Sequence, residues 1–398
     1  MKTGWQTKKV SEIAKHSLGK MLDKAKNKGE PKPYLRNLNV RWFDFDLSDV
    51  LEMRFLPEEA ARYTAVKGDV LICEGGYPGR AAIWEQDEPI YFQKALHRVR
   101  FHEPERNKWF LYYLLSKDFD GTLKSHFNGA GIQHFTGESL AQFEVPLPPL
   151  PEQQRIVHIL DEAFAGIATA KANAEKNLEN ARALFESHLQ SVFTLRRSGW
   201  VEKPLGEFAT FRNGINYTKN SKGERIKIVG VRNFQNHFFA PLDDLDTVTI
   251  DGKLSKSDSL RQNDILAVRS NGNIELIGRS LLVGEVTEKI SHSGFTIRIR
   301  LSTGEVLPRY LCHFMKSASS RKRFTDGGTG TNIKSLNQGM LSALAVPFPP
   351  IPAQEALVDQ LEGLSEETQR LESIYQQKLA ALEALKKSLL HQAFTGNL

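Results

Sequence analysis

The 398-residue sequence predicts an α+β protein in which two globular domains are separated by two long helices that form an antiparallel coiled coil, as a pseudo-two-fold repeat. Three observations predict this fold class. One proline-rich segment occurs twice, a long run of helical periodicity follows each copy, and short strand patterns broken by turns precede each copy. We expect four consecutive segments, at residues 1–148, 149–197, 198–350 and 351–398.

The repeat is clearest around the proline-rich segment. Val145–Gln153 reads VPLPPLPEQ and recurs as VPFPPIPAQ at Val346–Gln354, an offset of 201 residues. The same offset continues without an insertion as far as Phe193 and Phe394. An ungapped match of this length indicates a duplicated unit.

Upstream of the proline-rich segment the two halves match less closely. Gly68-Asp69-Val70-Leu71 faces Asn263-Asp264-Ile265-Leu266 at an offset of 195, and Arg98-Val99-Arg100 faces Arg298-Ile299-Arg300 at an offset of 200. These are strand patterns, and turn residues follow several of them. The sequence therefore predicts two globular domains of similar α+β build whose loops differ.

A helical pattern of roughly 40 residues follows each proline-rich segment. Apolar or small side chains recur every three or four residues from Ile156 to Leu184, and again from Leu357 to Leu385, in a near-heptad stripe. Such a helix is about 60 Å long, which is too long to pack on one compact domain. We expect the two helices to pair antiparallel; the alternative is that each packs on its own domain.

The composition is that of an ordinary soluble protein, with 40% hydrophobic and 25% charged residues. The N-terminus has no signal-peptide pattern, and no stretch approaches the roughly 18 apolar residues that a membrane helix needs. Cys73 and Cys312 stand alone, so neither a disulfide framework nor a CxxC metal site is available. We expect a cytoplasmic protein.

Positive charge is concentrated outside the predicted helices. The formal net charge is +6; residues 152–198 are neutral and residues 353–398 carry −3, which leaves +9 for the rest of the chain. The first 41 residues alone carry eleven Lys or Arg against three acidic residues. Such a concentration suits a phosphate backbone, although a solvated basic face would look the same.

The sequence contains no enzyme motif. An adenine methyltransferase needs Asn or Asp before a Pro-Pro-aromatic motif, and Val145–Pro151 offers only the prolines. The glycine-rich run at 327–332 lacks the GK[ST] ending of a phosphate-binding loop, and the acidic residues near Asp251 are too cramped for a nuclease. The eleven histidines form no HxxxH pair. We expect a non-catalytic protein with no cofactor and no metal.

Predicted loop tips carry side chains suited to reading base edges. Arginine pairs bidentately with guanine, and Asn or Gln with adenine. A glycine-rich turn such as the one before Arg80 also lets the backbone approach a ligand closely. Each residue could equally be a structural loop residue. The candidate DNA-binding residues are Arg80, Lys94, Gln133 and His134 in the first half, and Arg269, Asn271, Asn273, Arg279, Asn332 and Lys334 in the second.

These motifs resemble the specificity subunit of type I restriction-modification systems. The resemblance covers essentially the whole chain and is carried by VPLPPLPEQQRIV at 145–157, its second copy, the helix after each copy, and the strand-loops GDVLICEGGYPGRAAIW and NDILAVRSNGNIELIGR. The second copy departs from the first at Ala353 and at Glu355-Ala356.

The resemblance implies two target recognition domains joined by two conserved helices, each domain reading one half of a bipartite target in double-stranded DNA. The helices would set the spacer between the half-sites and dock two adenine methyltransferase subunits, with nuclease-translocase subunits added for restriction. S-adenosylmethionine would bind the partner. Two other readings stay open: a fused methyltransferase-nuclease, and a coiled-coil adaptor without a role on DNA.

Overall fold

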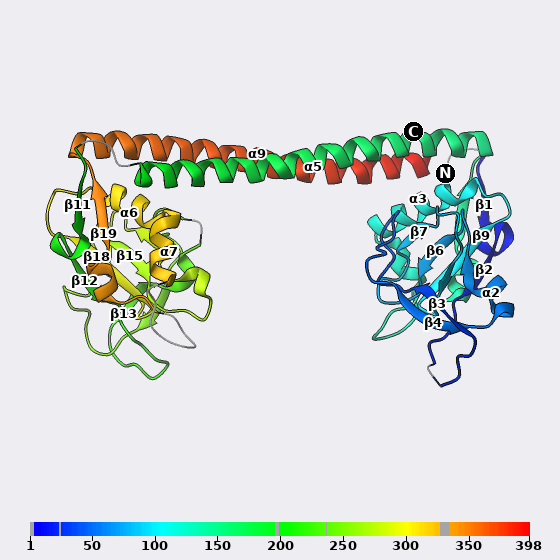
Figure 1. Ribbon diagram of the computed structural model, residues 1–398, viewed down its shortest axis with the longest axis horizontal. Helices are drawn as coiled ribbons and strands as arrows, with labels where there is room; N and C mark the ends of the chain where they lie inside the picture. The colour runs from blue at the N-terminus through cyan, green and yellow to red at the C-terminus, as the bar shows by residue number, and fades with distance from the viewer. Residues whose placement is uncertain (1–3, 24, 196–198, 236, 327–334) are drawn as a thin grey trace. The chain divides into compact units, whose positions relative to one another are not determined.

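The structure is a computed structural model that divides into two compact units (Figure 1). Unit 1 contains Met1–Glu175 and Gln377–Leu398, and unit 2 contains Lys176–Gln376. Each unit thus combines a globular body with one part of each long helix. The structure describes residues 4–23, 25–195, 199–235, 237–326 and 335–398.

The globular body of unit 1 contains two four-stranded sheets, with strand orders β2-β9-β6-β7 and β4-β3-β8-β5, and the ribbon β1-β10. All neighbours pair antiparallel except β3 and β8, which are parallel. Its elements are β1 (Gln6–Lys9), α1 (Val10–Ile13), β2 (Ala14–Leu18), β3 (Glu30–Leu35), β4 (Leu51–Phe55), η1 (Pro57–Glu59), α2 (Ala60–Tyr63), β5 (Thr64–Ala65), β6 (Val70–Cys73), β7 (Ala81–Ile83), β8 (Ile90–Phe92), β9 (Leu96–Phe101), α3 (Arg106–Phe119), η2 (Thr122–His126), α4 (Gly137–Gln142) and β10 (Glu144–Leu147).

The globular body of unit 2 has the sheets β12-β18-β15-β16 and β14-β13-β17 and the ribbon β11-β19, with β13 and β17 parallel. Its elements are β11 (Val201–Pro204), η3 (Leu205–Glu207), β12 (Ala209–Asn213), β13 (Arg225–Val229), η4 (Val231–Asn233), β14 (Asp246–Thr249), β15 (Ile265–Val268), η5 (Ile274–Leu276), β16 (Ser280–Leu282), β17 (Ile290–His292), β18 (Thr296–Leu301), α6 (Pro308–Lys316), α7 (Ala318–Asp326), α8 (Gln338–Ser342) and β19 (Ala345–Phe348).

The two bodies repeat the same arrangement of strands, which confirms the α+β class and the internal repeat. Each has a four-stranded antiparallel sheet, a second sheet with one parallel pair, and a ribbon that joins the first strand to the strand before a long helix. The strands named in the looser upstream match, β6 with β15 and β9 with β18, are central neighbours in the two equivalent sheets.

A buried carboxylate lies at the equivalent position of each body, directly before β6 in unit 1 and directly before β15 in unit 2. Asp69 is 1% exposed and accepts two hydrogen bonds from the Arg100 guanidinium, at 2.7 and 2.6 Å. Asp264, also 1% exposed, accepts the same pair from Arg300, at 2.6 and 2.7 Å. A bidentate ion pair of this kind fixes both the position and the orientation of the strands that carry it.

The proline-rich segment forms the junction between a strand and a long helix. The prolines end β10 and β19 and begin α5 (Leu150–Thr194) and α9 (Ile351–Thr395), since proline suits the first helical turn. In each copy a buried glutamine clamps the junction: Gln153 donates to the carbonyl of Pro148, and Gln354 to that of Pro349, both at 2.8 Å.

Each hydrophobic core is completed by both long helices. In unit 1 the Phe394 ring of α9 packs edge-on against Trp109, with centroids 4.8 Å apart. In unit 2 the Phe193 ring of α5 packs in the same way against Tyr310, at 5.4 Å. Phe193 and Phe394 are one offset of 201 residues apart. Further buried helix residues in these cores are Ile156, Leu160, Leu390 and Ala393 in unit 1, and Leu189, Val358 and Leu361 in unit 2.

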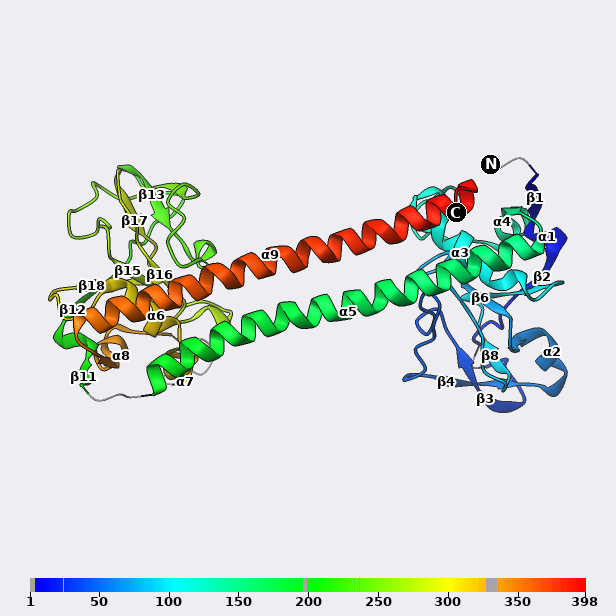
Figure 2. The same ribbon diagram turned by 90° about the horizontal axis from the view of Figure 1, so that it is seen from above.

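The two helices also contact each other, and they run antiparallel (Figure 2). In unit 1, Lys171 of α5 pairs with Glu383 of α9 at 3.0 Å. In unit 2, Arg182 of α5 pairs with Glu372 of α9 at 2.8 Å. An advance along α5 therefore corresponds to a step back along α9, as predicted. The antiparallel pairing is thus confirmed, and the helices also pack on the globular bodies.

The last residue of the predicted apolar stripe is exposed on both long helices. Leu184 is 63% exposed and Leu385, its equivalent in the repeat, is 48% exposed. The heptad itself is kept, because Ile167, Ala174 and Ala181 of α5 are buried at seven-residue spacing. The next half-buried residue is Phe185, four positions after Ala181, so Leu184 lies outside the contact. Within the described part of the chain, no helix is long and apolar enough to cross a membrane.

We predict that Asp69→Ala lowers the free energy of unfolding of unit 1 by about 2–4 kcal/mol, because it removes the partner of Arg100 and the acceptor of the Val66 N–H. Trp5, Trp42, Trp84 and Trp109 lie in unit 1 and only Trp200 in unit 2. Urea denaturation followed by tryptophan fluorescence therefore reports mainly on unit 1.

The control for this prediction is Asp87→Ala, which removes the exposed partner of Lys67. An exposed ion pair contributes little, so the unfolding midpoint of this variant should equal that of the parent. If the unfolding midpoint of Asp69→Ala equalled that of Asp87→Ala, the buried ion pair would not stabilise unit 1.

Candidate nucleic-acid interface

Four loop segments of unit 1 meet at one end of its sheets. Strands β3 and β8 are parallel, so the segments that follow them leave on the same side. The Phe135 N–H donates to the Glu74 carbonyl at 2.7 Å, and the Glu74 N–H donates to the Ala95 carbonyl at 2.9 Å. Asn37 Nδ2 donates to the carbonyl of Gly75 at 3.0 Å. We call the segments 36–49, 74–80, 93–95 and 128–135 the loop end of unit 1.

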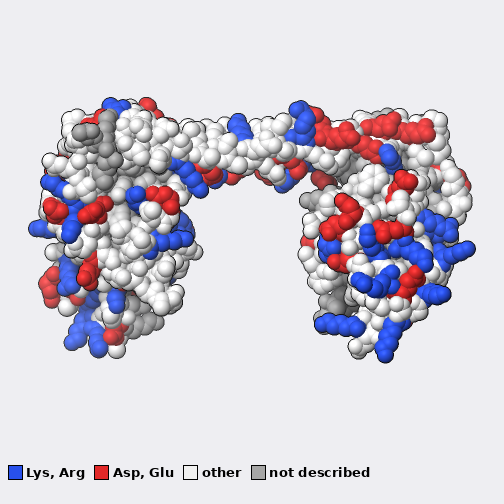
Figure 3. Space-filling model, turned by 180° about the vertical axis from the view of Figure 1, so that it is seen from behind, with Lys and Arg blue, Asp and Glu red and all other residues white. Residues whose placement is uncertain are grey.

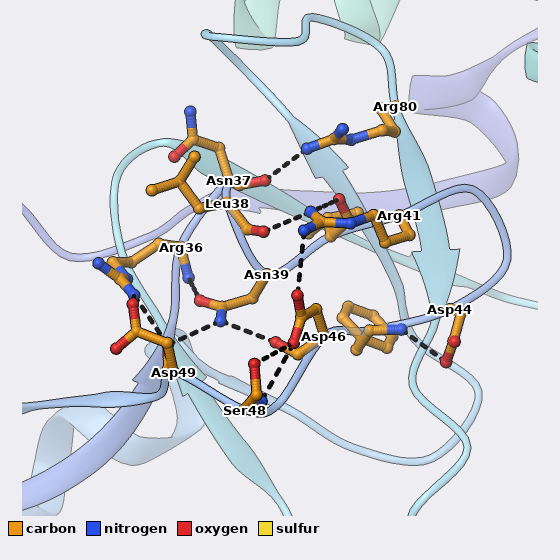
Figure 4. Close-up of polar contacts among 12 residues, drawn as sticks. Arg36, Asn37, Leu38, Asn39, Arg41, Asp44, Asp46, Ser48, Asp49 and Arg80 are labelled. Carbon is orange, nitrogen blue, oxygen red and sulfur yellow. Dashed lines mark hydrogen bonds and ion pairs between the residues drawn. The ribbon is translucent and has the colours of Figure 1, made fainter. Parts of the chain in front are cut away.

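A buried asparagine fixes the longest of these segments (Figure 4). Asn39 is 2% exposed; its Oδ1 accepts from the Arg36 N–H at 2.8 Å, and its Nδ2 donates to the carbonyls of Asp46 and Asp49 at 2.9 and 3.0 Å. The side chains of Arg36 and Asp49 add an ion pair at 2.7 Å. These contacts tie the two ends of the segment together, and Leu38, next to Asn39, is 54% exposed.

Arg80 joins two segments of the loop end. Its Nη2 donates to the carbonyl of Asn37 at 2.9 Å, and its guanidinium lies 4.0 Å from the centre of the Tyr77 ring. Arg80 is half-buried, whereas Tyr77 is 56% exposed. This arginine therefore positions the loops and supports an exposed aromatic ring.

The other candidates of the first half lie at the same loop end. Lys94 and Gln133 are exposed. His134 is half-buried, with Nδ1 3.7 Å from a carboxylate oxygen of Glu74. Gln133 lies in a small hairpin closed by two 2.8 Å backbone hydrogen bonds between Asn128 and His134. The structure thus brings together all four residues that the first half of the sequence suggested.

A buried histidine supports this hairpin from below. His97 is 1% exposed, and its Nε2 lies 2.9 Å from the carbonyl of Phe135. Burial is the main cause that lowers the pKa of His97 to about 4, so the ring is neutral at pH 7. With Nε2 carrying the proton, the ring donates to the Phe135 carbonyl and holds the segment in place.

Unit 2 has an equivalent loop end, made of the described residues 230–235, 237–245, 269–279, 293–295 and 335–336. The Leu336 N–H donates to the Arg269 carbonyl and the Arg269 N–H to the Phe295 carbonyl, both at 2.8 Å. This is the arrangement of Phe135, Glu74 and Ala95 in unit 1. Arg269 therefore occupies the place of Glu74.

The buried asparagine and the bridging arginine also have equivalents in unit 2. Asn233 is 3% exposed; it accepts from the Gly230 N–H at 2.9 Å and donates to the Asp244 carbonyl at 3.0 Å. Arg279 donates from Nη1 to the Phe234 carbonyl at 3.3 Å and from Nε to the Glu275 carbonyl at 3.2 Å. Like Arg80, Arg279 therefore has a positioning role in the loops.

Asn271 and Asn273 shape the segment 269–279. Asn271 Oδ1 accepts from the Asn273 N–H at 2.8 Å, and Asn273 Oδ1 accepts from the Glu275 N–H at 2.9 Å. Both side-chain oxygens are thus used in local turns, which is a common role for asparagine. The candidates Asn332 and Lys334 lie outside the described residues.

The two loop ends share a skeleton but display different surfaces. Unit 1 exposes Leu38, Tyr77 and Ile132 there, and unit 2 exposes Ile274 and Phe295. Sequence reasoning missed Asn37, Leu38 and Tyr77. The signal available for Tyr77 was its place inside the glycine-rich turn, whereas the segment that carries Asn37 and Leu38 has no such turn.

The charge of the molecule differs between the bodies and the helices. Figure 3 shows Lys and Arg side chains, mixed with Asp and Glu, over both globular bodies, and a band of acidic side chains along α9 in unit 2. No group of three metal-ligating side chains occurs among the described residues. The loop ends offer amides, cations and apolar tips, which suit recognition of base edges and phosphates. The acidic residues of α9 in unit 2 are Glu355, Asp359, Glu362, Glu366, Glu367 and Glu372.

Comparison with known proteins agrees with this architecture. The model of the type I restriction modification DNA specificity domain matches residues 2–180 and 197–383. The specificity subunit of the type I restriction enzyme StySPI from Salmonella potsdam is 24% identical over 322 residues, which cover 77% of this chain and 68% of that protein.

Two solved structures have a similar fold. A chain from a structure of a type I R-M system aligns with a TM-score of 0.80 at 16% identity, over 100% of this chain and 99% of that one. The HsdS subunit from Thermoanaerobacter tengcongensis aligns with a TM-score of 0.63 at 16% identity, over 100% and 98%.

We predict that Asn39→Ala accelerates amide hydrogen exchange in residues 36–49, because three hydrogen bonds to one buried side chain are lost. Hydrogen-exchange mass spectrometry on the full chain measures this. Residues 230–245 should be unaffected, and Asn233→Ala should give the reverse pattern. Uniform acceleration in both segments, or in neither, would contradict a local clamp in each unit.

Proposed function

Because the chain belongs to the family defined by the type I restriction modification DNA specificity domain, we propose that each unit reads one half of a bipartite target in double-stranded DNA. The observation that carries this proposal is the pair of loop ends. They share a buried asparagine and a bridging arginine but carry different tips, as expected for two readers of unlike sequences.

We assign base and phosphate contacts to exposed and half-buried side chains of the loop ends. In unit 1 these are Lys94, Gln133 and Asn37, with His134 beside them and Tyr77 and Leu38 as apolar contacts. In unit 2 they include Arg269, and Asn271 and Asn273 can still donate from their amide nitrogens. Arg80 and Arg279 position the loops. Asn332 and Lys334 remain candidates from the sequence.

We propose that the long helices set the spacer between the half-sites and carry the partner subunits. Their segments are neutral or acidic, so phosphate has little reason to bind there. The exposed Leu184 and Leu385 occupy equivalent positions on the two helices. An internal repeat gives two identical methyltransferase subunits equivalent docking sites.

In this scheme catalysis belongs to the methyltransferase and restriction subunits, and the complex acts in the cytoplasm. The segments 1–148 and 198–350 are the proposed exchangeable readers, and 149–197 and 351–398 the proposed connecting helices. Loops supply recognition and a rigid scaffold supplies their placement.

We predict that replacing residues 1–148 with the corresponding segment of another family member changes one half of the methylated motif and leaves the other intact, since the two loop ends share no described segment. Sequencing of methylated sites in DNA from cells that contain the chain and its methyltransferase measures this. The matched control is replacement of residues 198–350, which should change the opposite half. A change in both halves from either replacement would refute independent readers.

We predict that one extra heptad in each helix, inserted beside the Lys171–Glu383 ion pair, lengthens the spacer by about three base pairs. Seven helical residues add about 10.5 Å and nearly two full turns, so the pairing face is kept, and DNA rises 3.4 Å per base pair. Sequencing of methylated sites gives the new spacer.

The control for the heptad variant carries seven Gly and Ser residues after Lys219, in the exposed connection between β12 and β13. Its spacer should equal that of the parent. If a fully active heptad variant kept the parental spacer, the helices would not determine the spacing.

A further inference from the structure

Unit 2 contains a cavity of about 480 Å³ that the described function does not use. Its walls come from both long helices, from α6 and α7, and from the segment that includes Phe238. A volume of this size is typical of sites for small molecules. The cavity lies next to the loop end, because Arg279 belongs to both.

Three cationic side chains line this cavity without a carboxylate in ion-pair distance among the described residues. Lys316 Nζ donates to the His237 carbonyl at 2.9 Å, and Arg321 Nη2 donates to the Glu275 carbonyl at 2.6 Å. Arg279 donates to the same Glu275 carbonyl at 3.2 Å. Burial, and then the charges of Arg321 and Arg279, lower the pKa of Lys316. The lining also contains two carboxylates: that of Glu372 pairs with Arg182, and the charge of Glu186 acts on both Lys316 and Arg321. Arg279, Lys316 and Arg321 beside the single carboxylate of Glu186 leave a net positive charge, which favours an anion between them.

Two buried polar groups of the cavity wall have no hydrogen-bond partner in the described part of the chain. His313 is 2% exposed, and neither of its ring nitrogens has a partner; its ring stacks on Phe238 with centroids 4.4 Å apart. Burial lowers the pKa of His313 to about 3, so the neutral ring has one N–H to donate. Arg321 Nε is also unpartnered. Buried polar groups are nearly always paired, so these point to a missing partner.

Unit 1 shows that the fold does not require this cavity. At the offset of 201 residues, Phe164 corresponds to Ser365 and Tyr112 to His313. In unit 1 the rings of Phe43, Tyr112 and Phe164 fill the space. The ring centroids lie 4.8 Å apart for Phe43 and Tyr112, 5.3 Å for Tyr112 and Phe164, and 6.4 Å for Phe43 and Phe164. Ser365 has no ring, so the same space stays open in unit 2.

We propose that the unit 2 cavity binds a small anionic molecule that carries a phosphate group, contacted by Arg279, Lys316 and Arg321 and by the ring N–H of His313. A phosphate group has more acceptor oxygens and more negative charge than a carboxylate, so it can accept from several cations at once. Arg279 and Arg321 also hold the Glu275 carbonyl in the segment 269–279. The bound ligand therefore stabilises the loop end of unit 2, and the site exists independently of the half-site assignment.

Isothermal titration of the full chain with inorganic phosphate, adenosine 5′-monophosphate and adenosine tests the site. The two phosphates should bind at one site per chain and adenosine should not. Arg321→Gln should weaken both by about tenfold or more, since it removes a charge-assisted hydrogen bond. Ser365→Phe, which restores the unit 1 ring, should abolish binding. Lys289→Gln, an exposed lysine of unit 2 paired with Glu224, is the control and should bind as the parent does.

Absence of phosphate binding by the parent chain, or parental affinity in both variants, would overturn the proposal. If Ser365→Phe fails to fold by circular dichroism, Arg321→Gln alone decides. If a short duplex without the target sequence displaced the bound monophosphate, the three cations would bind the DNA backbone. That result would overturn the proposal of a small-molecule site. Methylation by folded variants should retain its bipartite motif, so a failure here stays distinct from a failure of the proposed readers.

Discussion

Each globular core depends on a helix end supplied by the other half of the sequence. Phe394 and Leu390 complete the core of unit 1, and Phe193 and Leu189 complete that of unit 2. Each such side chain contributes about 1.5–3 kcal/mol on burial, whereas an exposed pair such as Lys171–Glu383 contributes at most about 1 kcal/mol. Burial of the helix ends, rather than charge pairing along the helices, therefore determines the antiparallel arrangement.

In each loop end, the residues that hold the loops in place are the same in both units, whereas the exposed tips differ. Asn39 and Asn233 satisfy the backbone of equivalent segments from inside, and Arg80 and Arg279 bridge equivalent loops. The tips outside this skeleton differ in length and chemistry, with residues 74–79 in one unit and 269–278 in the other. The residues of a tip can change without loss of the hydrogen bonds of Asn39 or Asn233, because none of these bonds involves a side chain of either tip.

The sequence predicted the architecture because its signals are periodic or repeated. The ungapped match from Val145 to Phe193, and the pairing of Gly68-Asp69 with Asn263-Asp264, were visible without a structure. Asn39 and Asn233 were not, because a buried polar residue in an irregular loop has no period. Arg80 and Arg279 were selected as base readers by residue type, but both donate to backbone carbonyls. The last step of the predicted apolar stripe was wrong, because the half-buried residue that follows Ala181 on α5 is Phe185 and not Leu184.

The distribution of unit 1 along the chain has a consequence for protein synthesis. Unit 2 is a continuous segment, Lys176–Gln376, whereas unit 1 combines the first residues of the chain with the last. Domains fold on the ribosome as their residues emerge. The body translated first is thus completed only after unit 2 has been translated, when Phe394 reaches Trp109. Until then the apolar surface on which α9 packs stays exposed to solvent while the whole of unit 2 is being synthesised.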